Sequence, residues 1–239
     1  MGMPEEINRI VTDALSDLLF VTEPAGRDNL LQEGKEPARI FFVGNVMVDT
    51  LFHQLDRLAS TSAPEGLPAM DRPYGVVTLH RPSNVDDAET FRGILEALGK
   101  IAAHLPLVYP IHPRARKRLE EFGLEGLVSD GGIRLTPPLS YMHFLRLWKD
   151  AALVLTDSGG LQEETTALGV PCFTVRENTE RPITVEEGSN TMVGTSREGI
   201  LEAFGRFRAG VLKQGKIPEL WDGRAAERIV RALEEYVPR

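Results

Sequence analysis

The sequence has one cysteine, no long apolar run and no excess of positive charge. Cys172 stands alone among 239 residues, so no internal disulfide can form and the chain suits a reducing compartment. It lies in the apolar segment 170–175, which is typical of a strand. We therefore expect a thiol buried in the core, and neither a nucleophile nor a metal ligand.

Membrane and nucleic-acid signals are also absent. No run of about 18 apolar residues is present, and the amino terminus lacks the basic and apolar regions of a signal peptide. These absences predict a soluble, cytoplasmic chain with no membrane partner. The net charge of -8 and the isoelectric point near 5.3 argue against a nucleic-acid partner, because phosphate backbones are bound by clustered basic surfaces. The five histidines lack the spacing of a metal site, so no metal is predicted.

The composition is that of an ordinary globular protein, with 42% hydrophobic and 26% charged residues in a chain long enough for one or two domains. Residues 4–17 give the clearest helix prediction, because proline stands in the first turn and apolar residues recur at helical spacing. Strands at 18–21 and 40–43 and helices at 27–32 and 46–58 are expected next. The segment 59–73, rich in Ser, Pro and Gly, predicts a linker.

Beyond the linker, six apolar segments alternate with helical ones. They predict strands at 75–79, 107–111, 133–135, 153–156, 172–175 and 191–193. This alternation predicts an α/β fold with a parallel sheet, whose ligands gather outside the carboxyl ends of the strands. Polar residues stand at four of these ends, namely His80 with Arg81, His112, the segment 157–160 and Arg176.

The segment 156–164, TDSGGLQEE, runs from an apolar strand through a glycine turn into a predicted helix. Ser158 is expected to cap the helix with its hydroxyl. Gly159 and Gly160 have no β-carbon, so an anion can reach the amides of the first turn. Glu164 lies about one turn inside, where a carboxylate would repel a phosphate but suit a neutral vicinal diol such as that of ribose. An ordinary capped helix with acidic residues near its start is the alternative.

Six short motifs occur in order along nearly the whole chain. They are MPEEINR at 3–9, VGN at 43–45, LHRPSN at 79–84, YPIH at 109–112, DSGGLQEE at 157–164 and TERP at 179–182. Taken together, they resemble the motifs of the non-hydrolysing UDP-N-acetylglucosamine 2-epimerases. The resemblance implies two Rossmann-like domains of GT-B type that face a cleft, with UDP held mainly by the second.

The resemblance also implies an amino-terminal truncation. In the family, the helix with the first motif lies well inside the first domain, whereas here it begins the chain. The expected domains are an incomplete first domain at 1–58, a linker at 59–73, a UDP-binding domain at 74–220 and a carboxyl-terminal helix at 221–239. For a full-length protein, the resemblance implies a homodimer.

For the nucleotide, the resemblance implies that Ser158, Gly159 and Gly160 bind the diphosphate, that Glu164 binds the ribose and that Phe144 lies near the uracil. The residues by themselves support the first two assignments. Phe144 has a strong alternative, because an aromatic residue in such a helix is more often part of the core.

Five further residues are assigned by the resemblance. Arg181 would present two N–H groups to a phosphate, or else be a solvated surface arginine. His80 would donate to a phosphate oxygen or assist the departure of UDP, although a lone histidine after a strand is often structural. Arg9 would contact the nucleotide sugar. Arg81 and His112 would contact a second, allosteric substrate molecule, but HRPSN stands where many bacterial members have HRRE, which puts such regulation in question.

The reaction implied by the resemblance inverts carbon 2 of the sugar, by anti elimination of UDP and re-addition on the opposite face. Acid and base groups must serve both steps, and donors must stabilise the leaving diphosphate. Glu5 matches one catalytic glutamate of the family, and His80 is the second catalytic candidate. The alternative for Glu5 is a structural role, as an acid in the first turn that interacts favourably with the helix dipole. No cofactor is implied, because the reaction has no net redox change.

The leading hypothesis is an isomerase, a UDP-N-acetylglucosamine 2-epimerase, with UDP-N-acetylglucosamine and UDP as its partners. Two other catalytic carboxylates of the family have no counterpart in the chain, so we expect little or no activity from the chain alone. A non-catalytic UDP-binding domain and a GT-B glycosyltransferase remain as alternatives, and the MPEEINR segment argues against the second.

Overall fold

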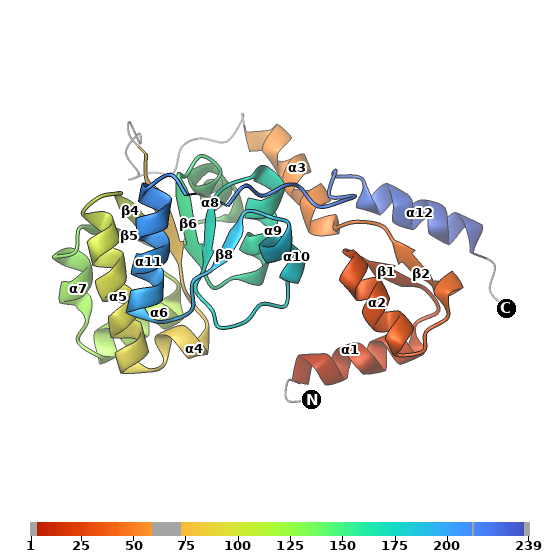
Figure 1. Cartoon of the computed structure of the whole chain (residues 1–239), viewed down its shortest axis with the longest axis horizontal. Coiled ribbons are helices and arrows are strands. Elements are labelled where there is room, and N and C mark those ends of the chain that lie inside the picture. Colours follow the sequence, from red (N-terminus) through yellow and green to blue (C-terminus); the bar gives the residue numbers. More distant parts are fainter. Residues whose placement is uncertain (1–3, 59–72, 212, 237–239) are drawn as a thin grey trace. The chain divides into compact units, whose positions relative to one another are not determined.

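The structure, a computed structural model, describes residues 4–58, 73–211 and 213–236. The chain forms two compact units. Figure 1 labels most of the helices and strands. Unit 1 contains residues 1–53 and 219–239, and unit 2 contains residues 54–218. The predicted linker at 59–73 lies almost wholly outside the described residues.

Unit 1 is built on two short parallel strands. β1 (Leu19–Val21) pairs with β2 (Ile40–Phe42), and α2 (Pro24–Gln32) connects them. Leu30 of α2 packs with Leu19, Val21 and Ile40 into a small apolar cluster. The other elements are α1 (Pro4–Leu15), the 3-10 helix η1 (Pro37–Arg39), the first part of α3 (Val46–Leu58) and α12 (Ala225–Glu235).

The carboxyl-terminal helix belongs to unit 1. The carboxylate of Asp49 in α3 accepts hydrogen bonds from the amides of Ala225 and Ala226 at 3.1 and 2.7 Å, which caps the amino end of α12. Trp221 is 2% exposed, and its Nε1 donates to the carbonyl of Thr22 at 3.0 Å. Through these bonds the carboxyl-terminal helix, which the sequence suggested as a segment of its own at 221–239, is grouped with residues 1–53.

Unit 2 contains a six-stranded parallel sheet in the order β5-β4-β3-β6-β7-β8. The strands are β3 (Gly75–Thr78), β4 (Leu107–Pro110), β5 (Ile133–Thr136), β6 (Leu153–Thr156), β7 (Cys172–Thr174) and β8 (Asn190–Met192). The predicted six-stranded parallel sheet is thus confirmed, and each predicted strand overlaps an observed one. Because the order reverses beside β3, a ligand site is expected outside the carboxyl ends of β3 and β6.

The helices of unit 2 cover both faces of this sheet. In Figure 1, α5 and α11 lie on one side of the sheet and α8 and α9 on the other, and α8 and α9 contact β3 and β6 respectively. Gly169 follows the last residue of helix α9 as its C-cap, and its φ of 68° is left-handed and suits glycine. The helices are α4 (Pro82–Val85), α5 (Ala88–Ala102), α6 (Pro113–Glu121), α7 (Glu125–Ser129), α8 (Tyr141–Trp148), α9 (Gly159–Leu168), α10 (Pro182–Glu186) and α11 (Arg197–Arg208).

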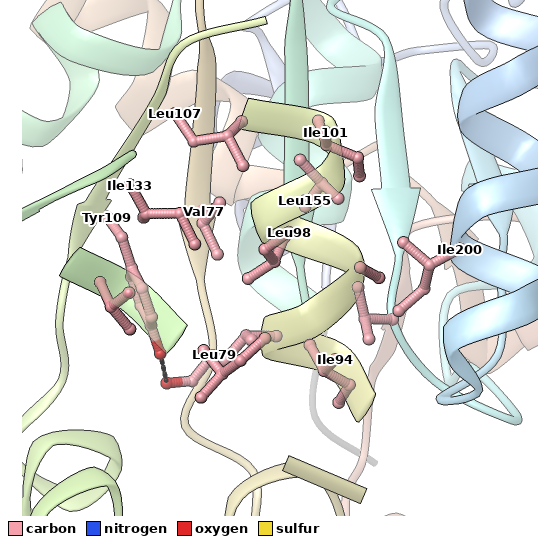
Figure 2. Packing of buried hydrophobic residues seen from close by; sticks show 14 of the residues in the cluster. Val77, Leu79, Ile94, Leu98, Ile101, Leu107, Tyr109, Ile133, Leu155 and Ile200 are labelled. Carbon is pink, nitrogen blue, oxygen red and sulfur yellow. Dashed lines mark hydrogen bonds between the residues drawn. The ribbon is translucent and has the colours of Figure 1, made fainter. Parts of the chain in front are cut away.

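The main core lies between the sheet and the face covered by α5 and α11. Figure 2 shows Ile94, Leu98 and Ile101 of α5 among strand side chains, in a cluster whose members are almost fully buried. The hydroxyl of Tyr109 donates to the carbonyl of Leu79 at 3.4 Å within this cluster. The core fixes the strands, and thereby the loops at their carboxyl ends.

Cys172 is 1% exposed, and burial raises the pKa of its thiol to about 12. The prediction of a buried core thiol is confirmed.

Within the described ranges, no helix is long and apolar enough to cross a membrane.

Candidate functional site

The amino end of α9 lies at the carboxyl end of β6 and is open. Ser158 occupies the N-cap position, as predicted, with φ of -81° and ψ of 127°. The prediction that its hydroxyl caps the helix is wrong, because Ser158 forms no such hydrogen bond. Its own amide donates to Oγ1 of Thr156 at 2.9 Å. The amides of the first turn therefore keep their capacity to bind an anion, which the helix dipole favours.

Space is available in front of this helix end. A β-carbon added to Gly159 or Gly160 would meet no atom of the described chain within 4 Å. A ligand can therefore approach both backbones closely, as the sequence predicted. Neither glycine has a positive φ, so close approach, and not backbone conformation, is the reason that glycine suits these positions.

Glu164 lies farther along α9 and is 6% exposed. Its Oε1 accepts a hydrogen bond of 2.8 Å from the hydroxyl of Tyr141, and no other hydrogen bond to this carboxylate is formed within the described part of the chain. Burial raises the pKa of the Glu164 carboxyl above its usual value, the bond from Tyr141 opposes that shift, and the charge of Glu163 adds to it. A nearly buried carboxylate with spare acceptor capacity is unusual and suits a polar ligand.

The loop that follows β7 is fastened to α9. Nε of Arg181 lies 2.9 Å from Oε1 of Glu163, and Oγ1 of Thr179 donates to Oε1 of Gln162 at 2.7 Å. The structure thus places Arg181 beside the open helix, with 43% of its side chain exposed. Its pairing with Glu163 also offsets a negative charge next to Glu164.

Asp157 joins the ends of β3 and β6, a role that the sequence analysis missed. Its carboxylate is fully buried and accepts from the amides of His80 and Arg81, both at 2.9 Å, and from Nδ2 of Asn84 at 3.2 Å. Nδ1 of His80 lies 2.8 Å from the other carboxylate oxygen. Because Asp157 occupies Nδ1, the ring of His80 has only Nε2 for a ligand.

The two predicted histidines lie close together. The ring centroids of His80 and His112 are 5.5 Å apart, so the structure brings the ends of β3 and β4 together as the parallel sheet predicted. His112 is the N-cap of α6, and its Nδ1 accepts from the amide of Arg114 at 3.1 Å. This bond gives His112 a local role, and its contact to a ligand stays a prediction.

Arg81 and Arg176 share Glu180. Arg176 is 6% exposed and donates to both oxygens of Glu180 at 2.6 and 2.7 Å, while Nη1 of Arg81 lies 3.3 Å from Oε1. Arg176 holds the pKa of the Glu180 carboxyl at about 2. Nε of Arg81 also donates to the carbonyl of Asp157 at 3.1 Å, so this pair of arginines ties the loops after β3 and β7 together.

Phe144 is half-buried on α8, three residues after Tyr141. Residues three apart lie on neighbouring parts of a helix surface. The bond from Tyr141 to Glu164 therefore brings this part of α8 near α9. The assignment of Phe144 to the uracil stays a prediction.

Glu5 and Arg9 lie on α1 in unit 1. The side chain of Glu5 is outside the described residues. Arg9 pairs with Glu6 at 2.7 Å, with Asp13 at 2.7 Å and with Glu33 at 2.5 Å, and these partners raise the pKa of its guanidinium. The predicted role of Arg9 at a nucleotide sugar remains untested. Among the described residues, no three His, Cys, Asp or Glu side chains lie together as a metal site.

The sequence is similar to that of known epimerases. Residues 1–234 match the model of a family described as UDP-N-acetylglucosamine 2-epimerase. The UDP-N-acetylglucosamine 2-epimerase of Methanocaldococcus jannaschii is 42% identical over 238 residues, which are 97% of this chain and 64% of that protein. The UDP-2,3-diacetamido-2,3-dideoxy-D-glucuronate 2-epimerase of Pseudomonas aeruginosa is 39% identical over 236 residues, or 98% of this chain and 64% of that protein.

Solved structures agree. The crystal structure of the M. jannaschii enzyme in complex with UDP-GlcNAc and UDP matches with a TM-score of 0.83 and 40% identity, over 98% of this chain and 66% of that one. The crystal structure of the Neisseria meningitidis UDP-GlcNAc 2-epimerase bound to UDP-GlcNAc matches with a TM-score of 0.85 and 28% identity, over 98% of this chain and 65% of that one. This likeness confirms the predicted α/β fold of GT-B type with Rossmann-like units. The chain spans less than two thirds of the length of these relatives.

Proposed function

Because this chain belongs to the UDP-N-acetylglucosamine 2-epimerase family, we propose that it supplies the UDP-binding part of an isomerase that interconverts UDP-N-acetylglucosamine and UDP-N-acetylmannosamine. One observation in unit 2 carries the proposal. A single helix, α9, combines an open amino end with a nearly buried carboxylate that accepts one hydrogen bond from the described residues.

The spacing on α9 suits one nucleotide. Glu164 follows Gly159 by five residues, or about 7.5 Å along the helix axis. Helical side chains lean toward the amino end of their helix, so the carboxylate lies nearer to the open end than its backbone does. The diphosphate accepts from the amides of Gly159 and Gly160 with Ser158 beside them, and the ribose diol donates to Glu164. Phe144, one turn along α8 from Tyr141, offers an apolar face to the uracil.

The proposed reaction divides into two steps. A base removes the proton from carbon 2 while the bond from carbon 1 to oxygen breaks, and UDP leaves with the electron pair. UDP then returns to carbon 1, and a proton reaches carbon 2 on the opposite face, so no net oxidation occurs. His80, whose Nδ1 faces Asp157, donates from Nε2 to the leaving diphosphate when its ring carries both protons, and Arg181 lies beside the same helix.

Glu5 and Arg9 enter the proposal through the family motif alone. Arg9 already pairs with three carboxylates, so a contact to the nucleotide sugar requires it to give up at least one of them. We expect Glu5→Gln and Arg9→Ala to slow epimerisation while leaving the affinity of the chain for UDP unchanged.

A cytoplasmic homodimer completes the proposal, and sedimentation of the purified protein tests the dimer.

A second sugar is favoured by one observation. The P. aeruginosa relative, named for UDP-2,3-diacetamido-2,3-dideoxy-D-glucuronate, is 39% identical, close to the 42% of the M. jannaschii relative. Both sugars present UDP and a proton on carbon 2, so the site on α9 suits either. Incubating the protein that carries this chain with each nucleotide sugar, and following the anomeric protons by NMR, distinguishes them. Epimer from neither sugar contradicts an epimerase function.

Calorimetry tests the nucleotide site. Glu164→Ala removes charge-assisted hydrogen bonds to the ribose, which typically contribute about 1.5–3 kcal/mol, so UDP affinity should fall about 10- to 150-fold. Glu202→Ala, which removes an exposed acid from α11 in the same unit, is the matched control and should bind as the parent does. Equal affinities for all three proteins would exclude Glu164 from the ribose site.

A further inference from the structure

The hydrogen bond from Tyr141 to Glu164 joins an exposed residue to a buried one. Tyr141 is 41% exposed, yet its hydroxyl donates at 2.8 Å to a carboxylate whose residue is 6% exposed. Tyr141 is the first residue of α8, and Ser140 already caps that helix by accepting from the amide of His143. The hydroxyl of Tyr141 therefore does not stabilise its own helix end. Its partner is the carboxylate on α9.

Among the described residues, the hydroxyl of Tyr141 is the one hydrogen-bond donor to the Glu164 carboxylate. Burial, and to a smaller extent the charge of the neighbouring Glu163, raise the pKa of the Glu164 carboxyl, and Arg181 from the loop after β7 pairs with Glu163 instead of Glu164. The described part of the chain supplies no hydrogen bond to Oε2 of Glu164. One oxygen is thus held by protein, and the other is left for a ligand.

We propose that Tyr141 is a positioning residue for ribose recognition: its hydroxyl fixes Oε1 of Glu164 so that Oε2 accepts from the vicinal diol. The proposal rests on the proposed function, since it takes Glu164 as the ribose acceptor. Tyr141 acts through Glu164 and transfers no proton in the reaction. Without this bond the carboxyl group can rotate and its buried charge is less stable, so both the geometry and the charge of the acceptor depend on Tyr141.

The consequence is discrimination between ribose and 2′-deoxyribose. A diol gives a held carboxylate two donors, whereas 2′-deoxyribose gives only one. Wild-type protein should therefore bind UDP more tightly than 2′-deoxy-UDP. Tyr141→Phe should weaken UDP binding about 3- to 10-fold and 2′-deoxy-UDP binding less, so that the ratio of the two affinities falls.

Tyr74→Phe is the matched control. The hydroxyl of Tyr74 donates to the carbonyl of Leu147 at 2.6 Å inside unit 2, where Tyr74 is 7% exposed. Removing that hydroxyl should lower the thermal midpoint and leave the affinity ratio unchanged. Tyr141→Phe removes a single oxygen from a residue that is 41% exposed, so its circular dichroism should match that of the wild type.

The pH dependence of binding supplies a second readout. UDP-N-acetylglucosamine is the suitable ligand, because its diphosphate is esterified at both ends and lacks the terminal phosphate proton that titrates near pH 6. Affinity should fall as pH drops through the raised pKa of Glu164. Because the bond from Tyr141 lowers that pKa, Tyr141→Phe should move the loss of affinity to higher pH. Tyr74→Phe should leave the profile unchanged.

Calorimetry with UDP, 2′-deoxy-UDP and UDP-N-acetylglucosamine on the wild type and the two variants decides the matter. The inference is supported if Tyr141→Phe alone shows a lower ratio of UDP affinity to 2′-deoxy-UDP affinity and loses UDP-N-acetylglucosamine affinity at a higher pH. If Glu164→Ala weakens binding but Tyr141→Phe changes neither readout, the proposed function stands and the role of Tyr141 is refuted. If the wild type binds no UDP, the proposed function fails and the inference fails with it.

Discussion

Replacing Asp157 with alanine should destabilise unit 2 more than any surface change. Four donor groups share this carboxylate: the amides of His80 and Arg81, Nδ2 of Asn84 and Nδ1 of His80. Asp157 and Asn84 are fully buried, whereas water can reach His80 and Arg81 in part. The loss therefore leaves one N–H of the buried Asn84 amide unpaired, while the same nitrogen keeps its bond to the carbonyl of Val175 at 2.8 Å. It leaves the amides of His80 and Arg81 with limited access to water.

The magnitude follows from these donors. Each buried donor left unpaired costs about 1–3 kcal/mol, but the variant also escapes the cost of burying a charge. Breaking a buried charged network by removing one partner typically costs about 3–5 kcal/mol, which we expect for Asp157→Ala. Against a total stability of about 5–15 kcal/mol, that is a large fraction. Asp157→Asn keeps one acceptor oxygen and should lie between alanine and the wild type.

Urea unfolding followed by tryptophan fluorescence measures this loss. The chain has two tryptophans, and Trp148 lies in unit 2 whereas Trp221 lies in unit 1. In a Trp221→Phe background, fluorescence reports on unit 2 alone. Asp150→Ala, which removes an exposed carboxylate paired with Lys149, is the control and should change stability by less than about 0.5 kcal/mol. A loss below about 1 kcal/mol for Asp157→Ala would refute the central place of this carboxylate.

Three further outcomes are expected. Gly160→Ala should keep or raise the thermal midpoint, because the added β-carbon meets no atom of the described chain. The same variant should bind UDP more weakly in calorimetry. Equal binding would contradict a close approach of the ligand to the helix end. The folded pKa of Glu180, about 2, lies below its unfolded value, so the stability gained from Arg176 is present above pH 4.5 and lost as pH falls toward 2. Glu180→Gln should flatten acid unfolding over that window, and an unchanged acid transition would count against the pair. Asp49→Ala should remove the cap of α12 and destabilise unit 1 by about 0.5–2 kcal/mol in urea unfolding, and no change would show that the cap is dispensable.

Local patterns predicted the elements and the position of the open helix end. Apolar periodicity and the flanking glycines gave α3 at 46–58 and β6 at 153–156 with the observed bounds. The predicted parallel sheet placed His80 and His112 at the carboxyl ends of strands, and the structure has their rings 5.5 Å apart. These successes rest on signals that lie within a few residues of each other.

The misses concern bonds between distant residues. Asp157 is bonded to the amide of His80 across 77 positions, and Tyr141 to Glu164 across 23, and no local period encodes either partner. The prediction that the hydroxyl of Ser158 caps α9 was wrong for a related reason. The N-cap preference says which residue suits the position and not where its hydroxyl points. The place of the carboxyl-terminal helix depended on Asp49, which is 176 positions from Ala225.

The measurement that tests the central claim most directly is a UDP titration of the chain labelled with ¹⁵N-glycine. The account predicts that, among the 22 glycines, the amides of Gly159 and Gly160 shift most, because they donate to the diphosphate, and that the same titration of Glu164→Ala shifts them only at higher UDP concentration. UDP binding that leaves both amides unshifted while other glycines move would contradict a nucleotide site on α9.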